Sequence, residues 1–339
     1  MATKSRSSLA PADPNSDDSI TLGEYLTSWL ELCEGRGLRP ASIASYHAMI
    51  RITIAPRLGH LQLKDITPNY LNGLYQRLLR DGRKDGRGGL SPRTVRYVHG
   101  ILRKAFADAV RLGYVEANPC LAADPPSARA AKARQFPTWS PDDLRRFLDS
   151  VREDQHYAAF YLAVASGMRR GEVLGLRWCD LDLEAQQLSV VQCVIEVAHA
   201  VRVGPPKSER SRRMIALDAK TVAVLAEHKR AEEEKRLKRG GRLAPHELVF
   251  AHRDGSPIHP ACFSQTFNRR VATAHVPRIR FHDLRHTHAT LALRAHVHPK
   301  IVSERLGHST VAITLDTYSH CIPSLQREAA EAIGALLPQ

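Results

Sequence analysis

The sequence predicts a mainly α-helical protein with two domains, the second carrying a small antiparallel sheet. Its 339 residues are enough for two separate hydrophobic cores. Apolar residues recur at helical spacing along most of the chain. The stretch 188–203 is instead rich in Val and Ile and predicts strands, and 213–217 predicts a returning strand.

Four helices are expected in the first domain, which we assign to residues 21–118. Their starts are marked by a cap residue or a proline, at Thr21, Arg39-Pro40, Thr67-Pro68 and Ser91-Pro92. The second helix is expected to end at Pro56 and Gly59. Residues 1–20, rich in Ser, Pro and Asp, are expected to form a disordered tail.

A segment rich in Pro, Ala and Arg, residues 119–137, is expected to be an extended linker. The second domain is assigned to residues 138–339. Its first helix should begin with Ser140 as N-cap and Pro141 at the first helical position. After the strands, Asp218 should cap a long helix, and the remainder should be mostly helical.

Charge, cysteine content and apolar runs indicate the class of partner and the compartment. The formal net charge is +14, which favours polyanionic partners, although a basic enzyme without such a partner fits the charge equally well. The six cysteines form no C-x-x-C pair and are expected to be scattered thiols in a reducing compartment. We find neither a membrane-length apolar run nor a signal peptide, so we expect a cytoplasmic protein with no membrane partner.

The most informative stretch is 281–320, near the C-terminus. It holds three polar clusters, His282-Asp283-Leu284-Arg285, Leu306-Gly307-His308 and Tyr318. Apolar residues separate these clusters, so the stretch is not simply a solvated charged face: Leu284, Leu291, Ile301, Val302 and Leu306. A base, a fixed cation, a second imidazole and a phenol together indicate a nucleophile directed at an anion.

These clusters resemble the motifs of the tyrosine recombinase (phage integrase) family. That family has a His-x-x-Arg box, a Leu-Gly-His box and a nucleophilic Tyr ten residues after the second His, and this sequence has the same order and spacing. The family's first box, Gly-x-Arg-x-x-Glu on a helix, matches Gly167 to Glu172. The resemblance covers roughly residues 22–332.

The resemblance implies a DNA strand-breaking and rejoining enzyme that works without metal or cofactor. Tyr318 would be the nucleophile, forming a 3′-phosphotyrosyl link and freeing a 5′-hydroxyl. Arg169 and Arg285 would clamp the phosphate, which suits the planar guanidinium fork. Lys207 would be the general acid to the leaving 5′-oxygen.

Three further residues receive roles by the same resemblance. His282 is the candidate to assist deprotonation of Tyr318, and His308 to bond a phosphate oxygen. Glu172 would orient the side chains of the first box without touching DNA. Two of these assignments have alternatives in the sequence. Arg170 stands beside Arg169 and could take its place, although the motif register favours Arg169. Near Lys207, the positive charge could also come from Arg210, Arg212 or Arg213. The remaining histidines of the stretch are interpreted as structural or solvated: His286, His288, His296 and His298.

For the first domain, the resemblance implies a SAM-like four-helix bundle that clamps DNA. The fourth helix has a basic side, and we favour phosphate contacts over plain solvation for its members Arg93, Arg96, Arg103 and Lys104. The expected partners are double-stranded DNA attachment sites, three further copies in a tetramer on DNA, and directionality or host DNA-bending factors. The protein would then lie with the nucleoid. The C-terminal helix, Leu325 to Leu337, packs either on a neighbouring subunit or on its own domain.

Three alternatives compete with this interpretation. His282 and His286 lie four residues apart, as the two histidines of a zinc hydrolase do, but Arg285 would put a cation beside the metal. A DNA-binding protein without catalysis would not need a phenol at the position of Tyr318. A topoisomerase of the type IB kind would share the chemistry, and strand exchange between two duplexes would separate it from a recombinase.

Overall fold

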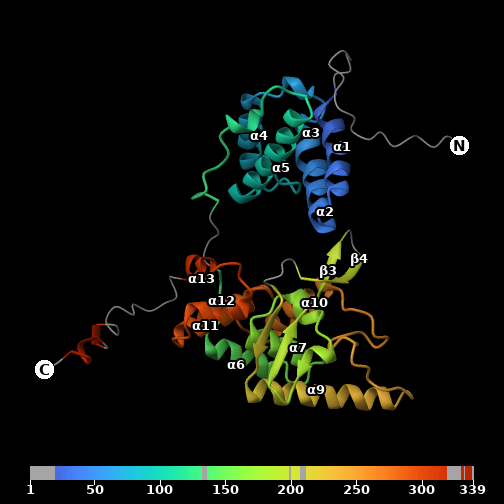
Figure 1. Cartoon of the computed structure of the whole chain (residues 1–339), viewed down its shortest axis with the longest axis vertical. Helices are drawn as coiled ribbons and strands as arrows, with labels where there is room; N and C mark the ends of the chain where they lie inside the picture. The colour runs from blue at the N-terminus through green and yellow to red at the C-terminus, as the bar shows by residue number, and fades with distance from the viewer. Residues whose placement is uncertain are drawn as a thin grey trace. The chain divides into compact units, whose positions relative to one another are not determined.

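The computed structural model describes residues 20–131, 136–197, 200–206, 211–318, 330–331 and 333–337. The expected N-terminal tail up to residue 19, Lys207 and most of the expected C-terminal helix lie outside these residues. The chain forms two compact units, Met1–Arg134 and Gln135–Gln339, each with its own core (Figure 1).

The first unit is a helical bundle. Its helices are α1 (Leu22–Gly35), α2 (Pro40–Met49), α3 (Ala55–Leu58), α4 (Pro68–Asp81) and α5 (Pro92–Arg111). A short 3-10 turn at Leu63–Asp65 lies between α3 and α4, and another at Pro119–Leu121 follows α5. The largest side chains in its core are fully buried: Tyr25, Trp29, Tyr75 and Phe106. The mainly helical first domain is therefore confirmed.

Local capping explains where most of these helices begin. Thr21 accepts a hydrogen bond from the Glu24 amide and the Glu24 carboxylate bonds back, which closes a capping box at α1. Ser91 accepts from the Thr94 amide at α5. Thr67 occupies the N-cap position of α4 as expected, but its side chain makes no capping bond.

The expected end of the second helix at Pro56 is wrong. A π-helix over Ile50–Ile54 follows α2 directly, and Ala55 N donates to Ile50 O at its end. Pro56 then lies within α3, directly after the π-helix, and does not end the helical stretch. The chain stays helical to Leu58 and leaves the helix at Gly59.

Part of the expected linker packs on the first unit. Cys120 and Ala123 are buried in its core. The Asp124 amide donates to Asn72 Oδ1 at 2.7 Å, and Arg96 Nη1 donates to Pro126 O at 2.6 Å. The segment is therefore not extended over 119–126, because its buried side chains and paired backbone groups hold it against α4 and α5.

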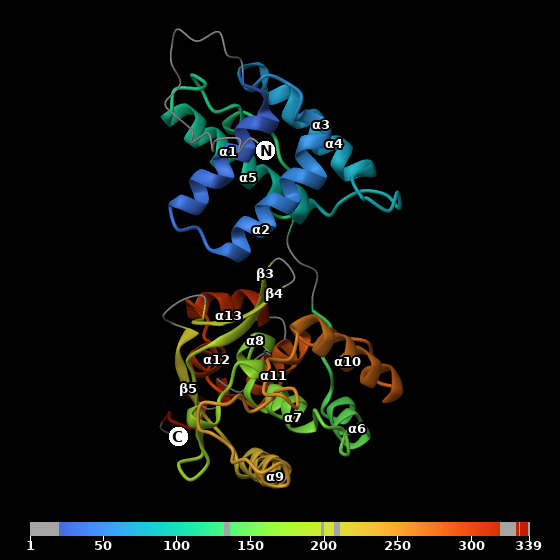
Figure 2. The ribbon, with the colours of Figure 1, turned by 90° about the vertical axis from the view of Figure 1, so that its right-hand side faces the viewer.

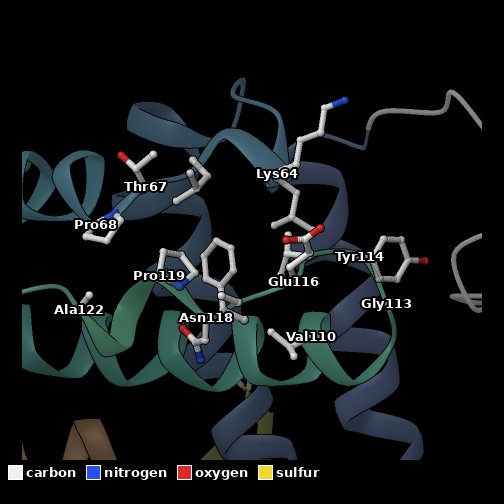
Figure 3. Close-up of a pocket in the computed structure, with 15 residues that line it drawn as sticks. Lys64, Thr67, Pro68, Val110, Gly113, Tyr114, Glu116, Asn118, Pro119 and Ala122 are labelled. Atoms are coloured by element: carbon white, nitrogen blue, oxygen red, sulfur yellow. The ribbon is translucent and has the colours of Figure 1, made fainter. Parts of the chain in front are cut away.

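A pocket of about 840 Å³ lies in the first unit, between the 3-10 turn at 63–65 and the chain that follows α5 (Figure 3). Apolar groups such as Phe106 and Val110 line it, with Lys64 and Glu116 among the polar residues. All of its lining residues belong to the first unit, so it includes none of the residues of the three family boxes. We number these boxes in chain order: the first is 167–172, the second 282–285 and the third 306–308.

The second unit combines helices with two small antiparallel sheets. Its helices are α6 (Pro141–Ser150), α7 (Tyr157–Ser166), α8 (Arg170–Leu174), α9 (Ala219–Leu237), α10 (Pro260–Thr273), α11 (Asp283–Arg294), α12 (Pro299–Leu306) and α13 (Val311–Tyr318). One sheet has the order β1-β2-β5, formed by Leu181–Asp182, Gln187–Val190 and Arg213–Ala216. The other pairs β3 (Cys193–Val197) with β4 (Ala200–Gly204). Within this unit the β3–β4 hairpin and the long helix α9 lie at opposite ends (Figure 2).

An aromatic cluster supports the helix that carries the second box. Phe281 packs against Phe263 and Phe267 with ring centroids 5.1 and 5.3 Å apart. The Trp139 amide donates to Thr287 Oγ1 at 3.2 Å, which ties the start of the unit to α11. Helix α11 is consequently buried although its sequence is polar, and it buries Asp283, Arg285, His286 and Thr287. Buried polar groups need hydrogen-bond partners, so a helix that buries several of them marks a candidate functional site.

Within the described ranges, no helix is both long enough and apolar enough to cross a membrane.

Candidate active site

The first box forms the corner between α7 and α8. Gly167 ends α7 in the left-handed conformation, with φ of +65°. A Cβ there would lie 2.7 Å from side-chain atoms of both His288 and Leu306, so only glycine fits. Arg169 is the extended N-cap residue of α8 and is not helical, contrary to the expectation that the whole box lies on a helix.

The corner points Arg169 toward the third box. Arg169 Nη2 donates to Gly307 O at 3.1 Å, across 138 residues of sequence. Its neighbour Arg170 instead donates to Ser264 Oγ at 2.7 Å. The structure therefore places Arg169, and not Arg170, against the Leu-Gly-His box.

Glu172 lies at the centre of this arrangement and is only 3 % exposed. Its Oε1 accepts from Arg169 Nη1 at 2.7 Å, and its Oε2 accepts from Arg213 Nη2 at 2.9 Å. Burial by itself would raise the pKa of Glu172, but Arg213 and Arg169 outweigh burial and hold that pKa below its usual value. The carboxylate is thus ionised and fixes two guanidinium groups at once.

Arg213 begins strand β5, in line with the expected returning strand, but its contact with Glu172 is not anticipated by the sequence, which offers it only as an alternative charge near Lys207. Its side chain is 7 % exposed, and besides Glu172 it reaches Arg305 O with Nε at 2.5 Å and Ser211 O with Nη1 at 3.0 Å. A Cβ at Gly307 would lie 3.0 Å from Arg213 Nη1, so the glycine of the third box gives this side chain room. Arg213 therefore fixes the turn between α12 and α13.

Arg285 enters the same region from α11. Its Nη1 donates to Gly167 O at 3.0 Å, and the residue is 3 % exposed. Burial, followed by the positive charge of Arg169, lowers the pKa of Arg285 to about 9, so it stays charged at neutral pH. Three guanidinium groups thus face one carboxylate, that of Glu172. Such a site has an excess of positive charge in a poorly solvated place, which an anion would relieve.

Neutral imidazoles lie beside these cations. His308 Nδ1 lies 2.8 Å from Thr314 Oγ1. When the Thr314 hydroxyl donates to Nδ1, the neutral ring carries its proton on Nε2, and that N–H can donate to another group. Burial, then Arg285 and Arg169, lower the pKa of His308 to about 4. Burial, then Arg285, also lower the pKa of His282. Both rings are therefore uncharged at neutral pH.

Tyr318 ends α13 and is 2 % exposed. Its hydroxyl oxygen lies 2.6 Å from His286 Nδ1. The rings of His282 and His286 meet edge to face at 5.3 Å, and His286 lies between His282 and the phenol in the chain of ring contacts. The phenol thus contacts His286, which the sequence interpretation left among the structural histidines. The sequence does carry one signal for this position: His286 stands four residues after His282, the spacing of side chains on one helix face, which also fits the zinc pattern considered above.

The basic candidates of the first unit divide into two groups. Arg93, Arg103 and Lys104 are exposed on α5, and Lys104 Nζ lies 5.8 Å from the Tyr46 ring centroid. Arg96 is half-buried, because its guanidinium bonds Pro126 O. In the part of the chain that the structure describes, no group of three or more His, Cys, Asp or Glu side chains could hold a metal ion.

Replacing Arg213 by Ala should destabilise the protein by about 3 to 5 kcal/mol, because it removes one of two partners from a buried carboxylate. Thermal and denaturant unfolding would measure the loss. Arg146 is the matched control: its ion pair with Asp143 is exposed, so Arg146→Ala should cost less than about 1 kcal/mol. Equal small losses for both variants would show that Glu172 does not depend on Arg213.

Acid should weaken the fold before most carboxylates titrate. Burial is the main cause that lowers the pKa of His286, His288 and His308 from 6.5 to about 4. Between pH 6.5 and 4 these three imidazoles bind more protons in the unfolded chain than in the folded chain. The free energy of unfolding should therefore fall as pH drops from 6.5 towards 4. Unfolding curves at a series of pH values would measure this fall, and it should be shallower in His288→Gln. A stability that is constant or rises over that interval would contradict the assignment of neutral buried rings.

Comparison with known proteins gives the family of the chain. Residues 138–323 match the model of the phage integrase family, and residues 21–79 match its N-terminal SAM-like domain. The chain is 28 % identical to a tyrosine recombinase XerC-like protein of Caldanaerobacter subterraneus, over 94 % of this chain and 83 % of that protein. It is 29 % identical to the ICEBs1 integrase of Bacillus subtilis, over 74 % of this chain and 67 % of that one.

Solved structures share the fold. The Tn1549 transposon integrase in complex with a circular intermediate DNA gives a TM-score of 0.74 at 20 % identity, over 93 % of this chain and all of that chain (100 %). A lambda integrase tetramer bound to a Holliday junction gives 0.65 at 20 % identity, over 90 % and 79 % of the two chains. The chain therefore belongs to the phage integrase family and is a tyrosine-type site-specific recombinase, an enzyme that cuts and rejoins DNA.

Proposed function

We propose that this recombinase cuts DNA by attack of the Tyr318 oxygen on a backbone phosphorus, and that it serves the integration or excision of a mobile element. The product would be a 3′-phosphotyrosyl link and a free 5′-hydroxyl, which keeps the bond energy for joining to another strand. One observation carries the proposal: the three boxes meet at a positively charged cluster, with Arg285 buried and Arg169 partly exposed, and a buried phenol lies beside it. The ICEBs1 integrase and the Tn1549 transposon integrase support the assignment to a mobile element.

The cationic cluster would stabilise the transition state. Arg169 and Arg285 would bind the non-bridging oxygens, since negative charge accumulates there as phosphorus becomes five-coordinate. His308 could donate Nε2–H to one of these oxygens, with Thr314 fixing its tautomer. His282 is the N-cap residue of α11, the helix that carries Arg285, and it would complete the surroundings of the phosphate. Glu172 would not touch DNA but would hold Arg169 in place.

Departure of the 5′-oxygen needs a proton. We assign Lys207 as the donor, because it follows Pro205-Pro206 between β4 and β5, at the family's lysine position. An ammonium with an ordinary pKa of about 10.4 is charged at neutral pH and can donate.

The division of labour between the units is also proposed. Residues 21–118 would clamp the duplex, with the exposed Arg93, Arg103 and Lys104 contacting phosphates. Residues 119–137 would connect this clamp to the catalytic domain at 138–339. Recombination between two sites would need four copies, as the lambda integrase tetramer on a Holliday junction suggests, and the segment 325–337 would pack on a neighbouring copy or on its own domain. Directionality or DNA-bending factors would add to this assembly, which would lie with the nucleoid.

The sharpest test isolates the phenol oxygen. Tyr318→Phe removes only that oxygen, so ring packing, affinity for DNA and the salt dependence of binding should change little. Covalent cleavage should be lost. Wild type on a nicked suicide substrate should form a protein–DNA adduct that resists SDS and yields to protease, with the DNA joined through its 3′ phosphate.

Arg285→Ala serves as the comparison, since it keeps the nucleophile while losing charge stabilisation of the transition state. It should slow adduct formation without moving the attachment site. An adduct formed by Tyr318→Phe, or one that peptide mapping places on Tyr157 or Tyr161, would refute the assignment of Tyr318.

A second test concerns the general acid. Lys207→Ala should bind DNA and cleave poorly. A substrate with a 5′-bridging phosphorothiolate should restore its cleavage rate, because a thiolate leaves without a proton. Lys207→Arg keeps the charge but donates a proton poorly, so it should behave like the alanine variant. Absence of rescue would transfer the acid role to another residue.

A further inference from the structure

We propose that His286 is the base that accepts the proton of Tyr318 when the phenol attacks phosphorus. This inference rests on Tyr318 as the nucleophile, as proposed above. It goes further because it assigns the proton to a named atom, Nδ1 of His286, and transfers to His286 a task that the motif comparison gave to His282. It begins from the contact of 2.6 Å between Nδ1 and the phenol oxygen.

The position of His286 follows from the helix that carries the second box. His286 lies one residue after Arg285 and one turn after His282 on α11. That turn directs its ring toward the end of α13, where Tyr318 lies. A heavy-atom separation of 2.6 Å is at the short end for a hydrogen bond involving a hydroxyl, so the proton has little distance to travel.

Phe136 fixes the ring of His286 from another side. The two rings are stacked, with centroids 3.9 Å apart and planes 5° from parallel. A stacked imidazole cannot rotate out of its plane without losing this contact, so Nδ1 stays directed at the phenol. The catalytic geometry is thus pre-organised in the protein before DNA binds.

The charges around His286 suit a base that becomes stronger when substrate binds. The titratable groups that act on it are the phenol of Tyr318 and the side chains of His282, Asp283, Arg285 and Arg280. Burial, then His282, with the two arginines contributing, lower the pKa of His286 to about 4, so the ring is neutral. In the tautomer that carries its proton on Nε2, Nδ1 accepts a hydrogen bond from the phenol of Tyr318. A phosphate bound at Arg285 would offset the cations that lower this pKa. The basicity of His286 would therefore increase when a phosphodiester is in place.

The proton balance of the step is complete. The O–H bond of Tyr318 breaks and an Nδ1–H bond forms on His286, while the phenol oxygen bonds to phosphorus. The bond from phosphorus to the 5′-oxygen breaks, and that oxygen takes its proton from the general acid, proposed to be Lys207. In the joining reaction, His286 returns its proton to the phenol oxygen and the 5′-hydroxyl gives one back to the acid.

The test is single-turnover cleavage of a nicked suicide substrate by the full chain. His286→Ala should reduce the rate by about 10² or more, the usual contribution of a positioned acid or base. It leaves a space between Phe136 and Tyr318 that imidazole can enter. Added imidazole should restore much of the rate, and imidazoles of higher pKa should restore more.

His286→Gln separates a base from a hydrogen-bonding group. Glutamine keeps a polar group close to the phenol but does not take up a proton near neutral pH, so cleavage should remain slow. Thermal unfolding and DNA binding of both variants show whether they are folded. If the alanine variant does not fold, the glutamine variant decides.

Two controls separate catalysis from positioning. Phe136→Ala keeps the base but loosens its ring, so it should slow cleavage without being restored by imidazole. His252 is exposed and belongs to none of the three boxes, so His252→Ala should cleave like wild type with or without imidazole.

Several results would overturn the assignment. Wild-type rates in His286→Ala or His286→Gln would show that no proton passes to this ring. A slow, folded, DNA-binding His286→Ala that imidazole fails to restore would reduce His286 to a positioning residue. These outcomes differ from a failure of the proposed nucleophile: in that case Tyr318→Phe would still form the adduct, whatever the His286 variants do.

Discussion

The rest of the site depends on one buried carboxylate. Glu172 binds Arg169 and Arg213 together, and through them it connects the α7–α8 corner, strand β5 and the turn after α12. Without its charge, the guanidinium groups would face one another in a poorly solvated place, where repulsion between like charges is strong. Its negative charge also helps to keep Arg285 protonated. An ion pair in such a place costs much desolvation, and the multiple hydrogen bonds to Glu172 are what offset that cost.

The aromatic core supplies the mechanical support. Phe281 ends the segment that leads into α11 and is wedged among other phenylalanines. Trp139 reaches the same helix through its backbone bond to Thr287. A polar helix can be buried there because the core fixes its axis while its side chains find partners. Rigid support of this kind is what a site needs to hold groups within a fraction of an ångström.

Much of this could be predicted from the sequence because the signals were local. Helix starts at Thr21, Ser91, Ser140 and Asp218 depend on side chains within three residues of the cap. The two-unit, mainly helical architecture followed from length and periodicity. The motif spacing identified the family, whose membership the family model confirms.

What sequence could not provide were contacts between distant segments. Arg213 and Glu172 are 41 residues apart, and His286 and Tyr318 are 32 apart, so no window of sequence shows them as neighbours. The sequence groups Ile301 with the apolar residues that separate the polar clusters, yet Ile301 is 50 % exposed, because a short helix leaves some of its apolar side chains at the surface. The packing of 119–126 on the bundle was hidden for the same reason, because composition alone describes a linker and not what its side chains touch.

The contact from Arg169 to Gly307 spans 138 residues, and that from Arg285 to Gly167 spans 118. Such contacts form only after much of the domain has condensed, because closing long loops costs entropy before any contact repays it. A growing or partly folded chain therefore carries the phenol, the arginines and the glutamate as separate groups with no shared geometry. A chain in which these contacts have not formed therefore lacks the shared geometry on which the proposed cleavage depends, even when every one of the side chains is present.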